Sequence, residues 1–252
     1  MIFNAEGLVL KGIDYGESHK IVHILSPSLG KFSAIALGAK KTKSKFSATT
    51  QPLMLGSFVL FRKGDSLASL NQSEIIQSYP KLRNDLLLST YAMYILDVTE
   101  RVQEENEPAF ELFQMLTSIL NKMEEGYDAE ILVRIFEIKL FALKGYRPCV
   151  DQCLHCNAVE EGYAYRFSVR LGGFLCPRCT QQDPKAMHIT PSVAKLVRVF
   201  LYIDLERIGE ISVKKDTRAG LEEVSQAFIR EHLGLQMKGH TMIAQIKSVY
   251  ES

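Results

Sequence analysis

Short segments rich in β-branched and aromatic residues alternate with turn residues over the first 80 positions. These segments cover 7–13, 20–25, 31–37, 57–62 and 67–70, the last continuing toward 75–76. Turn residues fill 26–30 and 63–65. Five strands in about eighty residues are typical of a small closed β-barrel, and the common five-stranded barrel is the OB-fold. We therefore expect an N-terminal OB-fold.

From Pro80 onward the apolar residues recur at helical spacing. Polar caps, prolines and glycines mark the expected ends of the helices. The expected helices run from Asn84 or Asp85 through Val98, from Pro108 to near Gly126, from Asp128 to Leu143, from Thr190 through Leu201, and from Leu221 to Leu233. We expect the last two to return onto the central bundle, because alone they could not bury both faces.

Two pairs of cysteines interrupt the helical pattern. Cys153 and Cys156 form one Cys-x-x-Cys pair, and Cys176 and Cys179 form another after nineteen residues. This spacing predicts a structural Zn²⁺ site with four thiolate ligands. Between the pairs, 163–168 and 174–175 suit two strands joined by a turn at 171–173. Cys149 is the odd thiol, and we expect a small buried residue there, with replacement of Cys153 as ligand left open.

Other uses of the cysteines fit less well. Two disulfides would require an oxidising compartment, yet the chain begins Met-Ile-Phe-Asn-Ala-Glu, without a basic segment followed by an apolar run. A redox Cys-x-x-Cys would explain one pair only. The expected fold class is thus α+β and multidomain: an OB-fold at 1–80, then an all-helical domain at 81–148 and 183–252, which carries a four-cysteine zinc ribbon at 149–182.

The overall net charge of +1 conceals an uneven distribution. Residues 1–80 carry nine Lys and Arg against five Asp and Glu, whereas residues 81–148 carry eight against twelve. Four lysines fall within six positions after the third expected strand, at Lys40, Lys41, Lys43 and Lys45. A positive loop beside an OB-fold favours single-strand nucleic-acid binding, in which bases stack on aromatic rings. A solvated loop that only aids solubility is the alternative.

Phe46, or a strand aromatic such as Phe32, is a candidate for the stacking face, whereas Phe32, Phe58 and Phe61 taken individually are expected in the core. The full set of expected DNA contacts is Lys31, Lys40, Lys41, Lys43, Lys45, Phe46 and Arg62.

Catalytic patterns are missing from the sequence. It contains no glycine-rich phosphate loop and no Gly-x-Ser-x-Gly elbow. None of the six histidines starts the His-x-Glu pattern of a zinc deaminase, and four sulfurs would leave no open metal position. No apolar run approaches the ~20 residues of a membrane span. We expect a cytoplasmic protein that is not an enzyme.

The order of motifs along the whole chain resembles the RecO family of bacterial DNA repair proteins. The residues that carry the resemblance are Glu6 to Leu10, Asp14 to Glu17, Gly30 with Lys31, Gly38 to Lys41 with Ser44, Gly145 to Pro148, Phe167 and Gly172 with Gly173, together with the two cysteine pairs. The resemblance implies an N-terminal OB-fold, a helical domain and an inserted zinc module, with zinc tied to a subgroup of the family.

The resemblance also implies an activity, recombination mediation. Such a protein binds single- and double-stranded DNA, anneals strands, works with RecR and helps RecA to displace single-strand-binding protein, and it associates with the nucleoid during repair. Two other classes remain open. A zinc-ribbon protein that binds RNA or is associated with translation would prefer RNA, and a structural adaptor would bind partners without salt-dependent DNA affinity.

Overall fold

The computed structural model describes residues 1–64, 66–159 and 166–250. They fold as two compact units: Met1–Glu125 with Lys238–Ser252, and Gly126–Met237. Position 65 of the expected turn and positions 163–165 of the expected ribbon strand lie outside the described residues.

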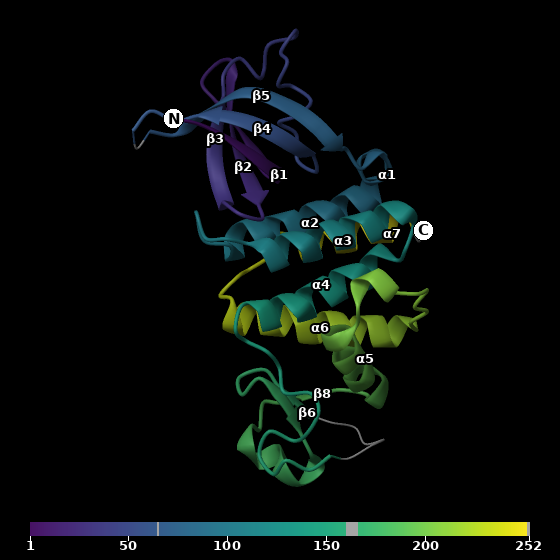
Figure 1. Cartoon of the computed structure of the whole chain (residues 1–252). Helices are drawn as coiled ribbons and strands as arrows, with labels where there is room; N and C mark the ends of the chain where they lie inside the picture. The colour runs from purple at the N-terminus through teal and green to yellow at the C-terminus, as the bar shows by residue number, and fades with distance from the viewer. Residues whose placement is uncertain (65, 160–165, 251–252) are drawn as a thin grey trace. The chain divides into compact units, whose positions relative to one another are not determined.

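The first unit begins with a closed five-stranded barrel (Figure 1). Its strands are β1 (Ile2–Tyr15), β2 (His19–Ser26), β3 (Gly30–Ala36), β4 (Leu55–Phe61) and β5 (Ala68–Gln77). Their order around the barrel is β1-β2-β3-β5-β4. The predicted OB-fold is confirmed.

Strand β1 closes the barrel because it is long enough to belong to both walls. Its first half pairs with β4 from Ile2 to Leu8, and its second half pairs with β2 from Leu8 to Tyr15. The register shifts between Val9 and Lys11, and such a bulge bends a strand sharply. A short parallel contact between β3 and β5 completes the circle.

The barrel encloses a hydrophobic core to which the segment between β3 and β4 contributes. The buried residues are Ala5, Val9, Val22, Ile24, Phe32, Ala34, Ala36, Ala39, Phe46, Met54, Phe58, Leu60, Ala68 and Leu70. Ala39, Phe46 and Met54 come from the connecting segment, so this loop is part of the packed interior as well as of the surface.

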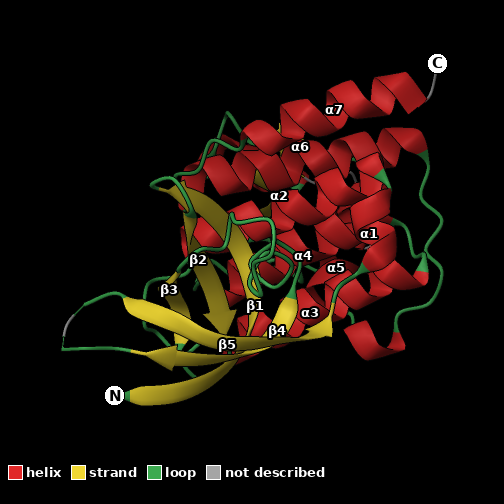
Figure 2. Cartoon of the chain, turned by 90° about the horizontal axis from the view of Figure 1, so that it is seen from above, coloured by secondary structure: helices red, strands yellow, loops and turns green. Residues whose placement is uncertain are grey.

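The rest of the first unit is helical, and Figure 2 draws the helices in red. They are α1 (Pro80–Asn84), α2 (Leu86–Val102), α3 (Phe110–Glu125) and α7 (Lys238–Tyr250). Asp85 caps α2 as predicted, accepting a hydrogen bond from the Leu88 N–H at 2.8 Å. The sequence pattern did not predict α7. This helix packs on α2, with the rings of Tyr94 and His240 4.5 Å apart and Ile243 buried.

The second unit is built on α4 (Ala129–Leu143), α5 (Pro191–Tyr202) and α6 (Lys215–His232). Asp128 and Thr190 cap α4 and α5 as predicted. Helices α5 and α6 pack against α4, which agrees with the expected return of these helices onto a central one. Helix α6 begins six residues earlier than expected, in a polar turn that carries no apolar periodicity. No helix among the described residues combines the length and hydrophobicity that crossing a bilayer requires.

Within the first unit, the loop between α2 and α3 packs tightly on the turn between β2 and β3. The Asn106 N–H donates to the Lys31 carbonyl at 2.9 Å, and the Ala109 N–H donates to the Pro27 carbonyl at 3.1 Å. A Cβ on Gly30 would lie 1.8 Å from the Glu107 carbonyl oxygen. The backbone of Gly30 also has a φ of +70°. Only glycine meets both conditions, since an L side chain is strained at positive φ.

Gly30→Ala should therefore lower the free energy of unfolding by more than about 2 kcal/mol, because left-handed strain adds to a backbone clash. Urea unfolding followed by circular dichroism measures the loss. Gly64→Ala is the matched control, since Gly64 has a φ of +55° with nothing within 4 Å of an added Cβ. Equal losses in the two variants would contradict the packing argument.

Candidate metal centre and nucleic-acid surface

A three-stranded sheet supports the cysteine pairs in the second unit. Strand β6 (Arg166–Ser168) pairs antiparallel with β7 (Gly173–Leu175) and, on its other side, with β8 (Met187–His188). The predicted hairpin is confirmed for its described residues. Its two glycines serve different purposes: Gly172 has a φ of +79°, whereas a Cβ on Gly173 would lie 2.4 Å from the Cys149 carbonyl oxygen.

The hairpin brings the four predicted ligands together. Four Sγ atoms all lie within 4.8 Å of one another, those of Cys153, Cys156, Cys176 and Cys179. The Cys156 and Cys176 sulfurs are 3.6 Å apart. Zinc–sulfur bonds of about 2.3 Å in a tetrahedron place the sulfurs about 3.8 Å apart, so the observed cluster fits such a shell.

Each pair sits on a turn that its own backbone closes. The Asn157 N–H donates to the Cys153 carbonyl at 3.0 Å, and the Cys179 N–H donates to the Cys176 carbonyl at 2.9 Å. These turns aim both thiols of a pair toward one point. The Cys176 N–H also donates to the Cys153 sulfur at 3.4 Å, which links the two turns.

The pKa values of two of the crowded thiols, Cys153 and Cys179, shift in opposite directions. Burial raises the pKa of Cys153, but hydrogen bonds from the backbone N–H groups of Cys156 and Cys176 outweigh burial and lower it to about 6. Burial, followed by the contact with the Cys176 side chain, raises the pKa of Cys179 to about 12. Four crowded thiolates require a compensating positive charge, which a bound metal ion supplies.

Cys149 is not part of this cluster. Its sulfur lies 3.7 Å from the Gln152 carbonyl oxygen. Its backbone pairs with the hairpin instead, because the Cys149 N–H donates to Gly172 and the Phe174 N–H donates back to Cys149, both at 2.9 Å. Of the two candidates left open, Cys153 lies with the other three cysteines and Cys149 does not. Cys149 is only partly buried, so the expectation of a buried residue there is wrong.

In the first unit, the lysine-rich segment is held against the tip of the β1–β2 hairpin. The Lys40 N–H donates to the Ser18 carbonyl at 3.0 Å, and the Gly38 N–H donates to Nδ1 of His19 at 2.9 Å. The Lys40 ammonium forms an ion pair of 2.7 Å with Asp14. This hydrogen bond from Lys40 lowers the pKa of Asp14. The start of the segment is therefore fixed to the barrel.

The four lysines differ in their surroundings. Lys41 and Lys43 are exposed and make no ion pair or side-chain hydrogen bond with any residue that the structure describes. The Lys45 ammonium donates to the Asn71 carbonyl at 2.8 Å and lies 4.9 Å from the centre of the Phe46 ring. Lys41 and Lys43 are thus the two lysines of the segment whose ammonium groups are available to a phosphate.

The expectation that Phe46 offers a stacking face is wrong for this conformation. Phe46 is only 5% exposed and belongs to the barrel core, and Phe32 is buried with it. An aromatic residue within a polar loop has two uses, stacking on a ligand or anchoring the loop in the core. Burial of an aromatic ring is strongly favourable, and the Phe46 ring is buried in the barrel core.

The other two expected DNA contacts have partners inside the first unit. The Lys31 ammonium donates to the Glu100 carbonyl at 2.5 Å, near the end of α2. The Arg62 guanidinium lies 5.6 Å from the centre of the Phe3 ring and lines a pocket of about 600 Å³. Asn106, which also lines this pocket, is flanked by exposed acidic residues at 105 and 107. Both cations therefore already serve packing within the unit.

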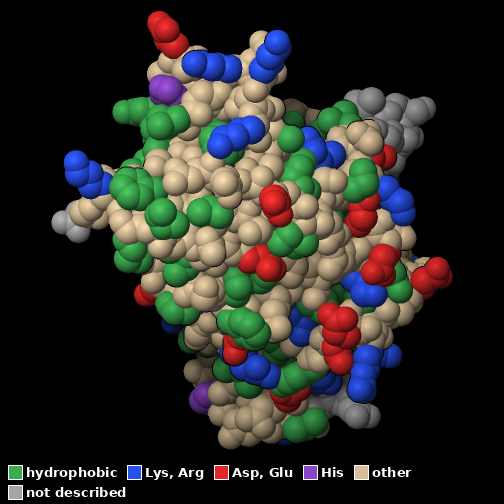
Figure 3. All heavy atoms as spheres, turned by 45° about the horizontal axis from the view of Figure 1, so that its top comes forward, with side chains coloured by type: hydrophobic (Ala, Val, Ile, Leu, Met, Phe, Trp, Pro, Cys, Tyr) green, Lys and Arg blue, Asp and Glu red, His purple; other side chains and the backbone are tan. Residues whose placement is uncertain are grey.

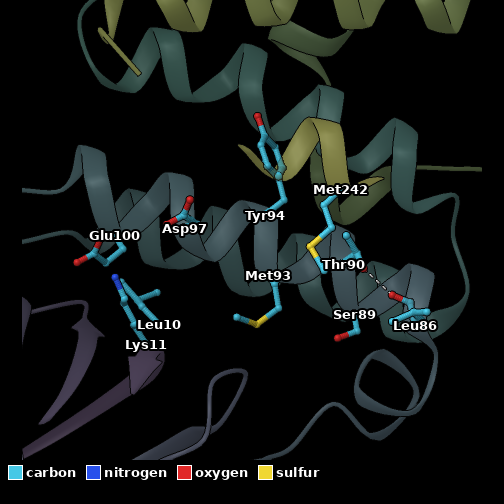
Figure 4. A pocket seen from close by; sticks show the side chains of 11 residues that line it. Leu10, Lys11, Leu86, Ser89, Thr90, Met93, Tyr94, Asp97, Glu100 and Met242 are labelled. Atoms are coloured by element: carbon cyan, nitrogen blue, oxygen red, sulfur yellow. Dashed lines mark hydrogen bonds between the residues drawn. The ribbon is translucent and has the colours of Figure 1, made fainter. Parts of the chain in front are cut away.

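A second pocket, of about 330 Å³, lies among β1, α2 and α7 (Figure 4). Its lining is mostly apolar, with Met93 and Met242 at its surface and Tyr94 buried. The one dashed bond in the view joins the Thr90 hydroxyl to the Leu86 carbonyl within α2. The lining includes no histidine or cysteine that could pair with a hydroxyl as a nucleophile–base set.

Comparison with known proteins gives matches along the whole chain. The family models described as Recombination protein O N terminal and Recombination protein O C terminal match residues 1–79 and 83–240. A DNA repair protein RecO of Halalkalibacterium halodurans is 40% identical over 249 residues, covering 99% of this chain and 97% of that protein. The DNA repair protein RecO of Bacillus subtilis is 38% identical over 249 residues, covering 99% and 96%.

Cys176→Ser should abolish stoichiometric metal binding, since it removes one of four converging thiols. Binding of a metal by thiolates contributes on the order of 10 kcal/mol to folding of small zinc peptides, so the variant should also lose protection of the ribbon against proteolysis. Elemental analysis of the reduced protein, with limited proteolysis, measures both effects. Cys149→Ser is the matched control and should keep one metal ion per chain; equal metal loss in both variants would contradict the assignment.

Proposed function

This chain belongs to the RecO family of DNA repair proteins, and from that premise we propose that it is a recombination mediator that binds and anneals single-stranded DNA through its barrel. In this proposal it also binds duplex DNA, works with RecR and helps RecA to load on DNA covered by single-strand-binding protein. The family resemblance supports all four of these partners: duplex DNA, RecR, RecA and single-strand-binding protein.

The observation that carries DNA binding by this chain is the fixed lysine-rich segment. The exposed lysines Lys41 and Lys43 follow the start of this segment. Contacts with Ser18, His19 and Asp14 hold that start against the barrel. A preordered cationic segment loses less conformational entropy when it binds a phosphate backbone than a free loop does. Phosphate contacts of this kind bind strands without reading their sequence.

The four-cysteine centre supports a structural role for the metal, and we propose that the metal is Zn²⁺. A shell of four sulfurs leaves no open position for a substrate or an activated water. The chain's own thiols hold the ribbon together, and we assign no turnover chemistry to it. Nucleotide hydrolysis by the pure protein, abolished by a point substitution in this chain, would contradict this part of the proposal.

An annealing assay tests the proposed function directly. Two complementary single strands with fluorescent labels should pair faster in the presence of the protein than alone. The same strands made of RNA form the control arm, because a translation-associated adaptor would prefer RNA and would not accelerate DNA pairing. No acceleration of DNA annealing, at low or moderate salt, would overturn the proposal.

The paired substitution Lys41→Ala and Lys43→Ala should weaken binding to all single-stranded sequences about equally. Each lost phosphate contact reduces the dependence of log affinity on log salt by about 0.7, so the slope should flatten by about 1.4. Fluorescence anisotropy with labelled oligonucleotides over a salt series measures both quantities. The control is Lys81→Ala with Lys195→Ala, two exposed helical lysines that should leave the slope unchanged.

Asp14→Asn should strengthen binding to single-stranded DNA and steepen the salt slope by up to about 0.7. The Asp14 carboxylate neutralises the Lys40 ammonium, and its lowered pKa keeps it ionised at neutral pH. The amide leaves that ammonium free for a phosphate. The same anisotropy titration reports the change, and Asp14→Asn combined with Lys40→Ala should cancel the gain. A gain that survives Lys40→Ala would show that Asp14 acts by another route.

A further inference from the structure

The four clustered cysteines differ in their access to solvent. Cys153 and Cys176 are fully buried and Cys179 is 6% exposed, whereas Cys156 is an exposed residue. The residues on either side of Cys156 are exposed as well. Molecules dissolved in water therefore reach this cluster from the side of Cys156.

The backbone of the first turn places Cys156 on the outside. The Leu154 N–H donates to the Phe174 carbonyl at 2.8 Å, and the Cys153 N–H donates to the Ala158 carbonyl at 2.9 Å. These bonds hold the start of the turn against strand β7, where Cys153 is buried. Cys156 comes after this start, in the exposed part of the turn. Its exposure is thus a consequence of how the turn is anchored.

The charges on the visible face of the protein are mixed in sign. In Figure 3, Lys and Arg side chains are interspersed with Asp and Glu side chains over the lower half of the view. A surface of this kind exerts no strong long-range attraction on anions or on cations. Access to a reactive sulfur then depends on its exposure, which favours small neutral reagents. Hydrogen peroxide, which oxidises thiolates, is such a reagent.

The sulfur of Cys176 lies close to that of Cys156. The two Sγ atoms are 3.6 Å apart, and a disulfide of about 2.05 Å needs a shift of only about 1.5 Å. The Cys153 sulfur is less available for such a bond, because it accepts hydrogen bonds from backbone N–H groups, including that of Cys176 at 3.4 Å. Hydrogen bonds to a thiolate lower its basicity and, with it, its nucleophilicity. Cys176 is therefore the cysteine placed to react with an oxidised Cys156.

We propose that the four-cysteine cluster is a peroxide-sensitive switch, in which Cys156 is oxidised first and then forms a disulfide with Cys176. This inference goes beyond the proposed role in DNA annealing, and it rests only on the assignment of a metal to the cluster. A bound metal keeps the four cysteines as thiolates, which are the nucleophilic form of the side chain.

The chemistry proceeds in two steps. In the first step, the Cys156 thiolate attacks one oxygen of hydrogen peroxide, the O–O bond breaks, and the departing hydroxide takes up a proton to become water. Cys156 is then a sulfenic acid. In the second step, the Cys176 thiolate attacks the Cys156 sulfur, the S–O bond breaks, and the leaving hydroxide becomes a second water. The two sulfurs together lose two electrons, which reduce one peroxide to two waters.

Oxidation removes half of the metal ligands. Only the Cys153 and Cys179 thiolates remain, and two sulfurs do not hold a structural zinc ion, which takes four ligands. The ribbon then releases its metal, and the segment around Cys179 loses its connection to the first turn. The disulfide joins the two turns through Cys176, so a dithiol reductant together with fresh metal restores the original state.

Peroxide titration of the zinc-loaded full chain tests this switch. A chromogenic chelator measures released zinc, and mass spectrometry of unreduced peptides identifies the disulfide. Each chain should release its zinc in step with formation of the Cys156–Cys176 bond, and reduction with added zinc should reverse both changes. A sulfenic-acid probe added during the reaction should label Cys156 before any other cysteine.

Two histidine substitutions separate oxidation of Cys156 from damage to the site. Three cysteines and one histidine also form a structural zinc shell, so Cys156→His and Cys179→His should each keep zinc. Cys156→His should lose the peroxide-induced release, because the exposed sulfur is gone. Cys179→His is the matched control and should release zinc as the unsubstituted protein does. Cys149→Ser should also respond normally, since Cys149 lies outside the cluster.

The possible failures have different meanings. Absence of zinc from the reduced, unsubstituted protein would overturn the metal assignment within the proposed function, whereas DNA annealing is measured independently of all these outcomes. Zinc that stays bound under peroxide sufficient to oxidise free glutathione would refute the switch, as would a disulfide between Cys153 and Cys156. Equal release from Cys156→His and Cys179→His would refute the role of Cys156. If a histidine variant fails to bind zinc, the labelling and the disulfide map of the unsubstituted protein decide.

Discussion

Burial of Phe46 is the interaction on which the proposed nucleic-acid surface depends. The barrel encloses a core that its strands do not fill alone, and the segment between β3 and β4 supplies Ala39, Phe46 and Met54 to it. Once the ring enters the core, the residues just before it are constrained. The segment is then held at two points. Ser18, His19 and Asp14 hold its start beside the hairpin tip, and Lys45 donates to the Asn71 carbonyl of β5. Core packing thereby determines where the positive charge stands.

The second unit uses metal ligands where its ribbon lacks a large core. Strands β6 and β7 have three residues each, too few to hold a sheet by hydrogen bonds alone. The four thiols join the two turns at one side of this sheet. At the other side, Phe167 lies 5.7 Å from Phe228, whose ring is 4.5 Å from Phe141 on α4. The cysteine cluster would hold the ribbon's two turns together once it binds a metal, and the aromatic contacts fix the ribbon to its helices.

Local patterns in the sequence were enough for the barrel strands, for most of the helices and for the clustering of four cysteines. These patterns involve residues that lie close together in the chain, so they can be recognised before the fold is known. They are the alternation along strands, the helix caps at Asp85, Asp128 and Thr190, and the spacing within the cysteine pairs. Helix α7 and the inward turn of Phe46 were decided by the tertiary structure. Each depends on a partner outside its own segment: α2 for the helix, and the closed barrel for the ring. Burial is a property of the assembled surfaces, and sequence patterns alone do not specify which of two possible faces an aromatic residue will meet.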